Sequence, residues 1–212
     1  MVCLNSKRWW RRPRGGLQPD GREAVGVQLE ISLCDIRPRI WRSFYVPGDI
    51  RLDRLHRVIQ IVMGWTNSHL HSFQTKDREY VMPDAHDPAW NAPVSDRIVL
   101  NERKHTLADL VTQRDDTFTY LYDFGDDWAH EVRAVKIDPL PDRLTRAVCL
   151  AGERACPPED CGGPFGFKEM CAALRKPKHP AHRHWRDWIE SFDAAAFDLD
   201  AVNRRLKRLR IG

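Results

Sequence analysis

The sequence has no long hydrophobic run. No stretch approaches the ~18 consecutive apolar residues that a membrane-spanning helix requires. Residues 1–16 are basic and lack the apolar core of a secretory signal peptide, and no hydrophobic run follows Arg11 and Arg12. We therefore expect a cytoplasmic protein without a membrane partner.

Cysteine is sparse as well. Six cysteines among 212 residues are too few for a disulfide scaffold, so in a reducing compartment they are free thiols or metal ligands. By contrast, a hydrophobic content of 42% and eight tryptophans argue against wholesale disorder. A chain of this length can bury a core, and it suits one domain with appendages.

The formal net charge of +4 hides an uneven distribution. Residues 1–14 and 204–212 carry five basic residues each and no acids. With these ten of the 34 basic residues removed, residues 15–203 hold 24 basic against 30 acidic residues, a formal charge of −6. A folded surface that follows a phosphate backbone would be basic instead. Nucleic-acid binding is therefore expected only through the two basic ends.

Hydrophobic periodicity predicts the first elements. Apolar residues alternate with polar ones from Val25 to Leu33, which is typical of a half-buried strand, and a second strand over 40–46 completes a hairpin. After Pro47 the spacing becomes helical as far as Met63, and Gly64 stands where a helix C-cap belongs.

Further strands are expected over 69–75, 78–82, 98–100, 117–123 and 129–137, and a short helix is expected from Thr106 to Val111. Residues 138–165 are expected to form a loop, followed by helices over 166–175, 181–192 and 198–210. Trp185 and Trp188 are expected to be core residues that hold these helices on the sheet.

This order predicts an α+β fold, with a mixed or antiparallel sheet, a helix packed on one face and a helical C-terminal extension. We expect a disordered basic leader over 1–23, the main domain over 24–165 and the extension over 166–212, packed on the same domain.

Four motifs in series carry a family resemblance: IRPRIWRSFYVP (36–47), LHRVIQIVMGWTNSHLHSF (55–73), YDFGDDWAHEV (122–132) and CLAGERACPPEDCGGPFGF (149–167). Together they resemble the plasmid ORF-3-like family over roughly residues 25–210. That family is also labelled the passenger TnpR family of insertion elements. The resemblance implies carriage on mobile elements and brings no established activity with it. A serine resolvase needs a nucleophilic serine, an arginine cluster and a helix-turn-helix, and the acidic body shows none of these arrangements.

The segment 122–130 combines aromatic and acidic side chains around Gly125. A Gly-Asp-Asp turn is ordinary hairpin chemistry. The flanking aromatic residues add the walls of a pocket whose rim carries carboxylates, which suits a polar or cationic ligand or a divalent cation. The predicted ligand-binding residues are Tyr122, Asp123, Asp126, Asp127, Trp128 and His130.

Two histidines lie on one face of the strand predicted over 69–75, because residues two apart in a strand project to the same side. His69 and His71 either pack against aromatic residues or offer two imidazoles to one ion. If they converge with Asp126 and His130, a metal-dependent hydrolase becomes an alternative, with these four residues as its catalytic candidates.

Cys149, Cys156 and Cys161 form the third candidate site. A loop rich in proline and glycine can wrap three thiolates around a zinc ion, although the spacing lacks a CxxC pair. The alternative is that the cysteines are small buried hydrophobic residues.

The residues around Trp41 also leave two readings open. Arg37, Arg39 and Arg42 beside an aromatic residue suit stacking on nucleic-acid bases, or an ordinary sheet. The leading functional prediction is a non-catalytic binding or adaptor module. In it the 122–130 turn and the 149–163 loop form a recognition pocket for an unknown ligand or protein partner. Zinc is its expected cofactor, if any; a hydrolase and a nucleic-acid accessory protein are the alternatives.

Overall fold

A computed structural model describes residues 24–82, 97–140, 144–189 and 191–211. Its centre is an eight-stranded sheet in the order β5-β4-β3-β6-β7-β1-β2-β8. The strands are β1 (Ala24–Leu33), β2 (Trp41–Pro47), β3 (His71–Gln74), β4 (Arg78–Val81), β5 (Ile98–Asn101), β6 (Thr117–Tyr122), β7 (Trp128–Leu140) and β8 (Val148–Glu153). The pair β4–β5 is parallel and the other pairs are antiparallel. The α+β fold with a mixed sheet is confirmed.

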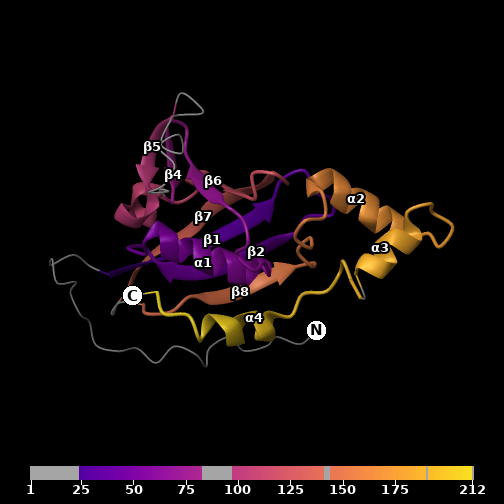
Figure 1. Cartoon of the computed structure of the whole chain (residues 1–212). Helices are drawn as coiled ribbons and strands as arrows, with labels where there is room; N and C mark the ends of the chain where they lie inside the picture. Colours follow the sequence, from indigo (N-terminus) through magenta and orange to yellow (C-terminus); the bar gives the residue numbers. More distant parts are fainter. Residues whose placement is uncertain (1–23, 83–96, 141–143, 190, 212) are drawn as a thin grey trace.

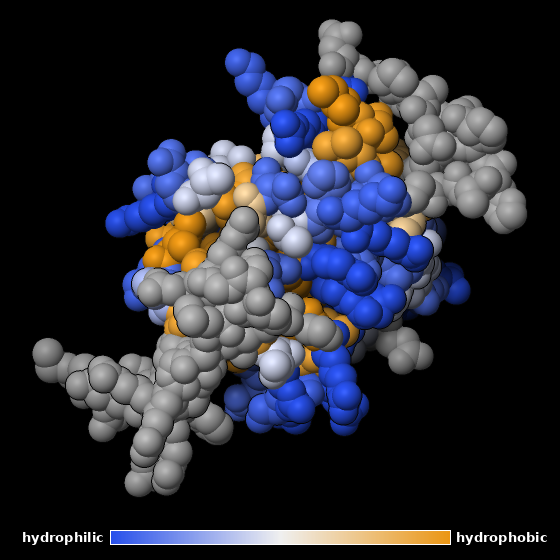
Figure 2. All heavy atoms as spheres, turned by 90° about the vertical axis from the view of Figure 1, so that its left-hand side faces the viewer, coloured by the Kyte–Doolittle hydropathy of each residue, from blue (hydrophilic) through white to orange (hydrophobic). Residues whose placement is uncertain are grey.

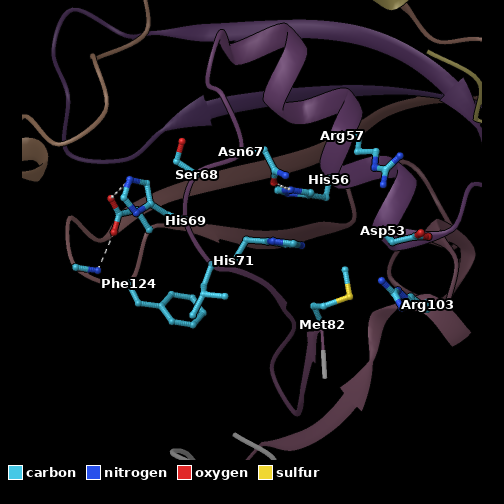
Figure 3. A pocket seen from close by; sticks show the side chains of 13 residues that line it. Asp53, His56, Arg57, Asn67, Ser68, His69, His71, Met82, Arg103 and Phe124 are labelled. Atoms are coloured by element: carbon cyan, nitrogen blue, oxygen red, sulfur yellow. Dashed lines mark hydrogen bonds and ion pairs between the residues drawn. The ribbon is translucent and has the colours of Figure 1, made fainter. Parts of the chain in front are cut away.

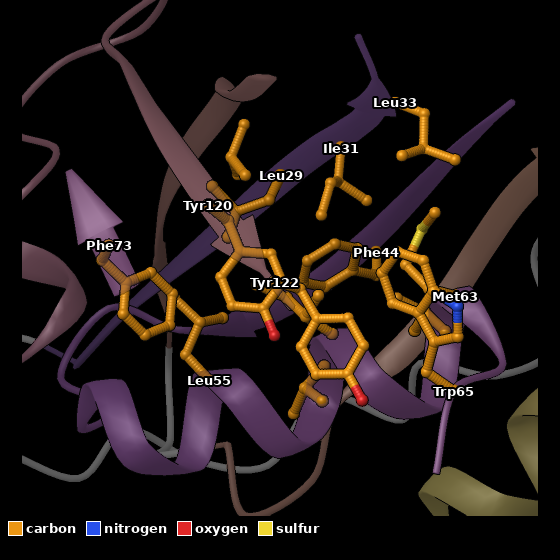
Figure 4. Packing of buried hydrophobic residues seen from close by; sticks show 14 of the residues in the cluster. Leu29, Ile31, Leu33, Phe44, Leu55, Met63, Trp65, Phe73, Tyr120 and Tyr122 are labelled. Atoms are coloured by element: carbon orange, nitrogen blue, oxygen red, sulfur yellow. The ribbon is translucent and has the colours of Figure 1, made fainter. Parts of the chain in front are cut away.

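One helix covers the centre of the sheet (Figure 1). Helix α1 (Leu52–Met63) ends where the spacing predicted, before the C-cap Gly64, whose φ of 111° is the left-handed conformation that glycine adopts readily. Its buried side chains meet the inward residues of β1, β2 and β6, among them Leu29, Phe44 and Tyr120 (Figure 4). The strict alternation of residues 25–33 therefore corresponds to one strand face packed against α1.

Three helices follow the sheet: α2 (Gly163–Leu174), α3 (His182–Trp188) and α4 (Leu199–Leu206). Helix α4 lies beside β8, where the amide of Asn203 exchanges two hydrogen bonds of 2.9 Å with the backbone of Cys149. Leu206 is buried and the neighbouring arginines are exposed. This arrangement covers an edge strand that would otherwise offer unpaired backbone groups.

Two expectations about the C-terminal half were wrong. The expected loop over 138–165 contains β8 and the end of β7, because β8 pairs with β2 and is covered by α4. Trp188 is 44% exposed, and α3 has no buried residue, because this short helix packs against α2 and not on the sheet. Trp185 is partly buried against the core.

Arg42 is 2% exposed and faces inward from β2. Its guanidinium donates hydrogen bonds to the carbonyl oxygens of Val62 (2.8 Å), Trp41 (2.7 Å), Glu153 (2.9 Å) and Arg154 (2.8 Å). It also lies 4.1 Å from the ring centroid of Phe197. The side chain thus joins the end of α1 to the end of β8, and it is not available to stack on a nucleic-acid base.

Seen from the side of β4 and β5, charged and polar side chains cover most of the visible surface, and hydrophobic ones gather in separate patches (Figure 2). None of the helices in the described ranges combines the length and apolar composition that crossing a membrane requires.

Candidate functional site

The turn between β6 and β7 is organised by one carboxylate. Asp123 adopts a φ of 59°, and its Oδ1 accepts hydrogen bonds from the backbone N–H groups of Gly125 (3.0 Å) and Asp126 (3.2 Å). Aspartate tolerates this left-handed conformation because its short side chain bonds to the nearby backbone. The second oxygen, Oδ2, is left facing His69 at 3.5 Å from its Nε2.

The loop after β8 packs onto this turn. The backbone N–H of Gly162 donates to Asp126 Oδ2 at 3.1 Å, and a Cβ at Gly163 would lie 2.3 Å from the carbonyl oxygen of Asp126. Glu159 accepts a 2.6 Å hydrogen bond from the hydroxyl of Tyr122 and further bonds from Thr66. The 122–130 and 149–163 segments therefore meet.

Three potential ligand atoms converge where they meet. His69 Nε2 lies 3.5 Å from Asp123 Oδ2 and 3.2 Å from Asp160 Oδ1, and all three atoms lie within 4.8 Å of one another. Although Nε2 is buried, it forms no aligned hydrogen bond with any described residue. One imidazole and two carboxylates are a donor set that suits divalent metals.

His56 belongs to a closed ring of hydrogen bonds that also includes Gln60, Tyr120 and Asn67. Gln60 Nε2 donates to the hydroxyl of Tyr120 at 3.0 Å, and this hydroxyl lies 2.8 Å from His56 Nδ1. His56 Nε2 bonds to Asn67 Oδ1, and the backbone N–H of Asn67 returns to Gln60 Oε1 at 2.8 Å. Burial and the neighbouring His71 lower the pKa of His56 to about 3, so its ring is neutral, with Nε2 as the donor and Nδ1 as the acceptor.

His71 stacks on His56 and is held by a buried acid. The two ring centroids are 3.5 Å apart with planes within 4° of parallel, and His71 Nε2 lies 2.8 Å from Glu102 Oε2. Glu102 is fully buried in the turn that follows β5. The sequence did not predict Glu102 as a partner of His71. Glu102 follows β5, and it comes close to His71 of β3 only because β5 pairs with β4 and β4 pairs with β3.

Of these residues, His56, Asn67, His69, His71 and Asp123 line one cavity of about 550 Å³ (Figure 3). His69 and Phe124 lie toward one end of it, with Asp123 against His69. The stacked imidazoles lie in the middle, and Asp53, Arg57 and Arg103 lie toward the other end. Asp53 accepts two hydrogen bonds from Arg51, of 2.9 and 2.8 Å. The guanidinium groups of Arg57 and Arg103 form no ion pair or hydrogen bond within the described part of the chain.

The four candidates for a hydrolase do not converge. His69 and His71 line the cavity, whereas Asp126 accepts from Gly162 in the loop contact. His130 is fully buried and its Nδ1 donates to the carbonyl of Tyr120 at 3.1 Å. Of the predicted ligand-binding residues, Asp123 reaches the cavity and Tyr122 supports it through Glu159. Trp128 is a core residue and Asp127 is an exposed turn residue.

The three cysteines lie near the same loop without grouping around one point. Cys149 is buried with its thiol 3.6 Å from the carbonyl oxygen of Ser43. Among the described residues, the cluster able to share an ion is the His69 group, and it includes none of the thiols. Burial raises the pKa of Cys149 to about 11, that of Cys161 to about 12 and that of Cys156 further, so all three are protonated near neutral pH. Zinc binding by these cysteines stays a prediction.

Comparison with known proteins identifies the family. A model of the plasmid pRiA4b ORF-3-like protein matches residues 25–201. The chain belongs to this family. It is 36% identical over 186 residues to the uncharacterized protein y4hQ of Sinorhizobium fredii, covering 86% of this chain and 91% of that protein.

A solved structure also resembles this chain. The crystal structure of a protein of unknown function, MM3350 from Methanosarcina mazei Go1, matches with a TM-score of 0.72 and 32% identity. The match covers 84% of this chain and 97% of that one. The solved structure shares the fold, and neither relative's name brings an activity, so the function has to be argued from the cavity.

Proposed function

We propose that this protein is a binding module whose cavity takes a small ligand bearing an oxyanion, such as a carboxylate or phosphate group. The observation that carries the proposal is the pair of guanidinium groups, Arg57 and Arg103, at one end of the cavity. Guanidinium groups bind carboxylate and phosphate oxygens through paired hydrogen bonds, and neither Arg57 nor Arg103 uses its guanidinium donors on another described residue.

The local charge supports an anionic ligand. Asp53 lies at the same end of the cavity as these arginines (Figure 3), and its two oxygens already accept from Arg51. An oxyanion at this end would therefore meet two cationic groups, and no described residue of the cavity wall places a free carboxylate beside them.

The rest of the cavity suits a flat or polar ligand body. The stacked rings of His56 and His71 are held by Asn67, Tyr120 and Glu102, so they form a fixed wall. Fixed polar side chains around a concave site are typical of ligand-binding pockets. Phe124, 42% exposed, adds apolar surface at the opposite end.

Thermal denaturation with inorganic phosphate or citrate, matched in ionic strength to sodium chloride and containing a chelator, tests this proposal. Both anions should raise the melting temperature of the wild type. The double variant Arg57→Gln/Arg103→Gln should lose this shift, and Arg183→Gln, which changes an exposed arginine of α3, should keep it. Equal shifts in all three proteins would reject an oxyanion site at these arginines.

A hydrolase remains the second candidate, favoured by the contact between His71 and Glu102. A carboxylate that accepts from one imidazole nitrogen fixes the tautomer and leaves the other nitrogen as an acceptor, as a general base requires. Slow turnover of p-nitrophenyl phosphate or p-nitrophenyl acetate that disappears in His71→Gln, in a protein that still unfolds cooperatively, would support it. Turnover unchanged in that variant would exclude His71.

Adaptor activity on mobile elements and nucleic-acid binding by the basic ends stay predictions. Residues 1–14 lie outside the described residues. At the other end Arg204, Arg205 and Arg208 are exposed beside the buried Leu206. This pattern is that of a solvated helix face, and it is compatible with salt-dependent phosphate contacts.

A further inference from the structure

We propose that His69, Asp123 and Asp160 bind one divalent transition-metal ion at the end of the cavity opposite Arg57 and Arg103. This site rests on different residues from the oxyanion site, and neither proposal requires the other. The three ligands come from the loop after α1, the β6–β7 turn and the loop after β8.

The separations match those around a metal ion. Zinc bonds to histidine nitrogen and carboxylate oxygen at ~2.0–2.2 Å, so neighbouring ligand atoms of a tetrahedral site lie about 3.4 Å apart. His69 Nε2 lies 3.5 Å from Asp123 Oδ2 and 3.2 Å from Asp160 Oδ1. An ion can enter between these atoms with small side-chain movements.

Each carboxylate is positioned by its surroundings. The Oδ1 atom of Asp123 is held by two backbone N–H groups, which turns Oδ2 toward His69. Asp160 has a φ of 59°, and the preceding residue, Glu159, is fixed by Tyr122 and Thr66. The turn and loop thus bring the donor atoms together before any ion binds, which reduces the ordering cost of binding.

His69 supplies the independent observation. Its Nε2 is buried between the two carboxylates and makes no aligned hydrogen bond with a described residue. Its two carboxylate contacts fall within ion-pair distance but lack hydrogen-bond alignment, and a buried polar atom without an aligned hydrogen bond carries a desolvation cost. Metal coordination by the lone pair of Nε2 removes this cost.

The site is open toward the cavity. His69 and Asp123 both line the cavity, together with Ser68 and Gly125. Metal sites that bind water or a ligand have three protein ligands and one open coordination position, whereas closed structural sites have four protein ligands.

Calorimetric titration of chelator-treated full-length protein with Zn²⁺, and separately with Mg²⁺, tests the site. We expect one Zn²⁺ per chain and much weaker Mg²⁺ binding, because a nitrogen donor favours the transition metal. His69→Ala and Asp160→Asn should each weaken Zn²⁺ binding at least tenfold. Asp160 has a side chain 71% exposed, so its replacement tests the site even if His69→Ala perturbs folding. Asp200→Asn, on an exposed acid of α4, should bind as the wild type does.

The cysteines provide the competing outcome. Cys156→Ser should leave the Zn²⁺ affinity unchanged, and the Co²⁺ form should lack the charge-transfer absorption of a thiolate ligand. No binding, binding retained in both His69→Ala and Asp160→Asn, or binding lost in Cys156→Ser would overturn the proposal. The thermal denaturation experiments with phosphate and citrate contain a chelator, so failure of the metal site and failure of the oxyanion site are recorded separately.

Discussion

The imidazole rings of His56 and His71 stack with centroids 3.5 Å apart and planes 4° from parallel. Two positive charges at this separation inside a protein would repel strongly. The structure avoids this because burial and His71 hold the pKa of His56 at about 3, while His71 contacts the carboxylate of Glu102. The ring of hydrogen bonds through Gln60, Tyr120 and Asn67 satisfies both nitrogens of the neutral His56.

Removing the hydroxyl of Tyr120 should break this ring. Tyr120→Phe leaves His56 Nδ1 without a donor and Gln60 Nε2 without an acceptor, both in a buried place. Unsatisfied buried polar groups cost about 1–3 kcal/mol. Urea denaturation should therefore show a loss in this range, and a loss below about 0.5 kcal/mol would contradict the described ring.

Arg42 should not be replaceable by lysine. Its guanidinium reaches four carbonyl oxygens from two directions, and a single ammonium group cannot reproduce this planar set of donors. We expect Arg42→Lys to lower the free energy of unfolding by at least ~2 kcal/mol, because carbonyl groups at the ends of α1 and β8 lose their partner.

Arg39→Lys is the matched control for this substitution. Arg39 has a side chain 44% exposed and pairs with Glu30 at 2.8 Å. Surface ion pairs of this kind contribute ~0–1 kcal/mol, so the control should stay close to the wild type. Equal losses in the two variants, measured by chemical denaturation, would mean that the burial of Arg42 has no energetic consequence.

The fold was predictable where the pattern is local. The alternation over 25–33 and the helical spacing that ends at Gly64 predicted β1 and α1, because one face of each element is buried in the same core. Strand β8 was missed because its edge position depends on distant partners: β2 on one side and Asn203 on the other. Trp188 was misplaced for the same reason, since periodicity does not say which surface a helix faces.

The candidate site was predictable in part. Asp123 and His69 stood out through their neighbours, and the loop after β8 stood out through its proline and glycine content. Glu102 and Arg103 gave no local signal, since they reach the cavity only through the pairing of β4 with β5. Asp160 belonged to a segment in which the cysteines drew attention, and its closeness to His69 follows from the packing of two loops.

Gly163 should be essential for that packing. A Cβ there would lie 2.3 Å from the carbonyl oxygen of Asp126, and its φ of 65° disfavours other residues. Gly64 provides the control, because its φ is 111° and a Cβ would meet nothing within 4 Å.

Both alanine variants pay the left-handed backbone cost of ~1–2 kcal/mol, and Gly163→Ala adds the cost of steric overlap, typically ~1–3 kcal/mol. Thermal denaturation should therefore give Gly163→Ala a lower melting temperature than Gly64→Ala. The reverse order would show that the loop and the turn are not in tight contact.

His130 should make the protein sensitive to mild acid. Its ring is fully buried, its Nε2 has no described partner, and burial lowers its pKa to about 4. In the unfolded chain the pKa of His130 returns to about 6.5. Between pH 6.5 and pH 4 this imidazole is therefore protonated in the unfolded state and neutral in the folded state. The neutral ring therefore costs no stability above pH 6.5, and stability falls as the pH decreases toward 4, by up to roughly 3 kcal/mol. His56, with a pKa of about 3, acts in the same direction.

His130→Gln removes the titrating ring and can still donate to the carbonyl of Tyr120. The variant should be less stable than the wild type at pH 7, because glutamine fits the site less well. Its deficit should shrink as the pH falls to 4, because it lacks the penalty that the wild type acquires. His184→Gln, on the exposed face of α3, should follow the wild-type curve. Urea denaturation at several pH values measures all three curves, and a deficit for His130→Gln that stays constant from pH 7 to pH 4 would show that the buried imidazole is not the acid-sensitive group.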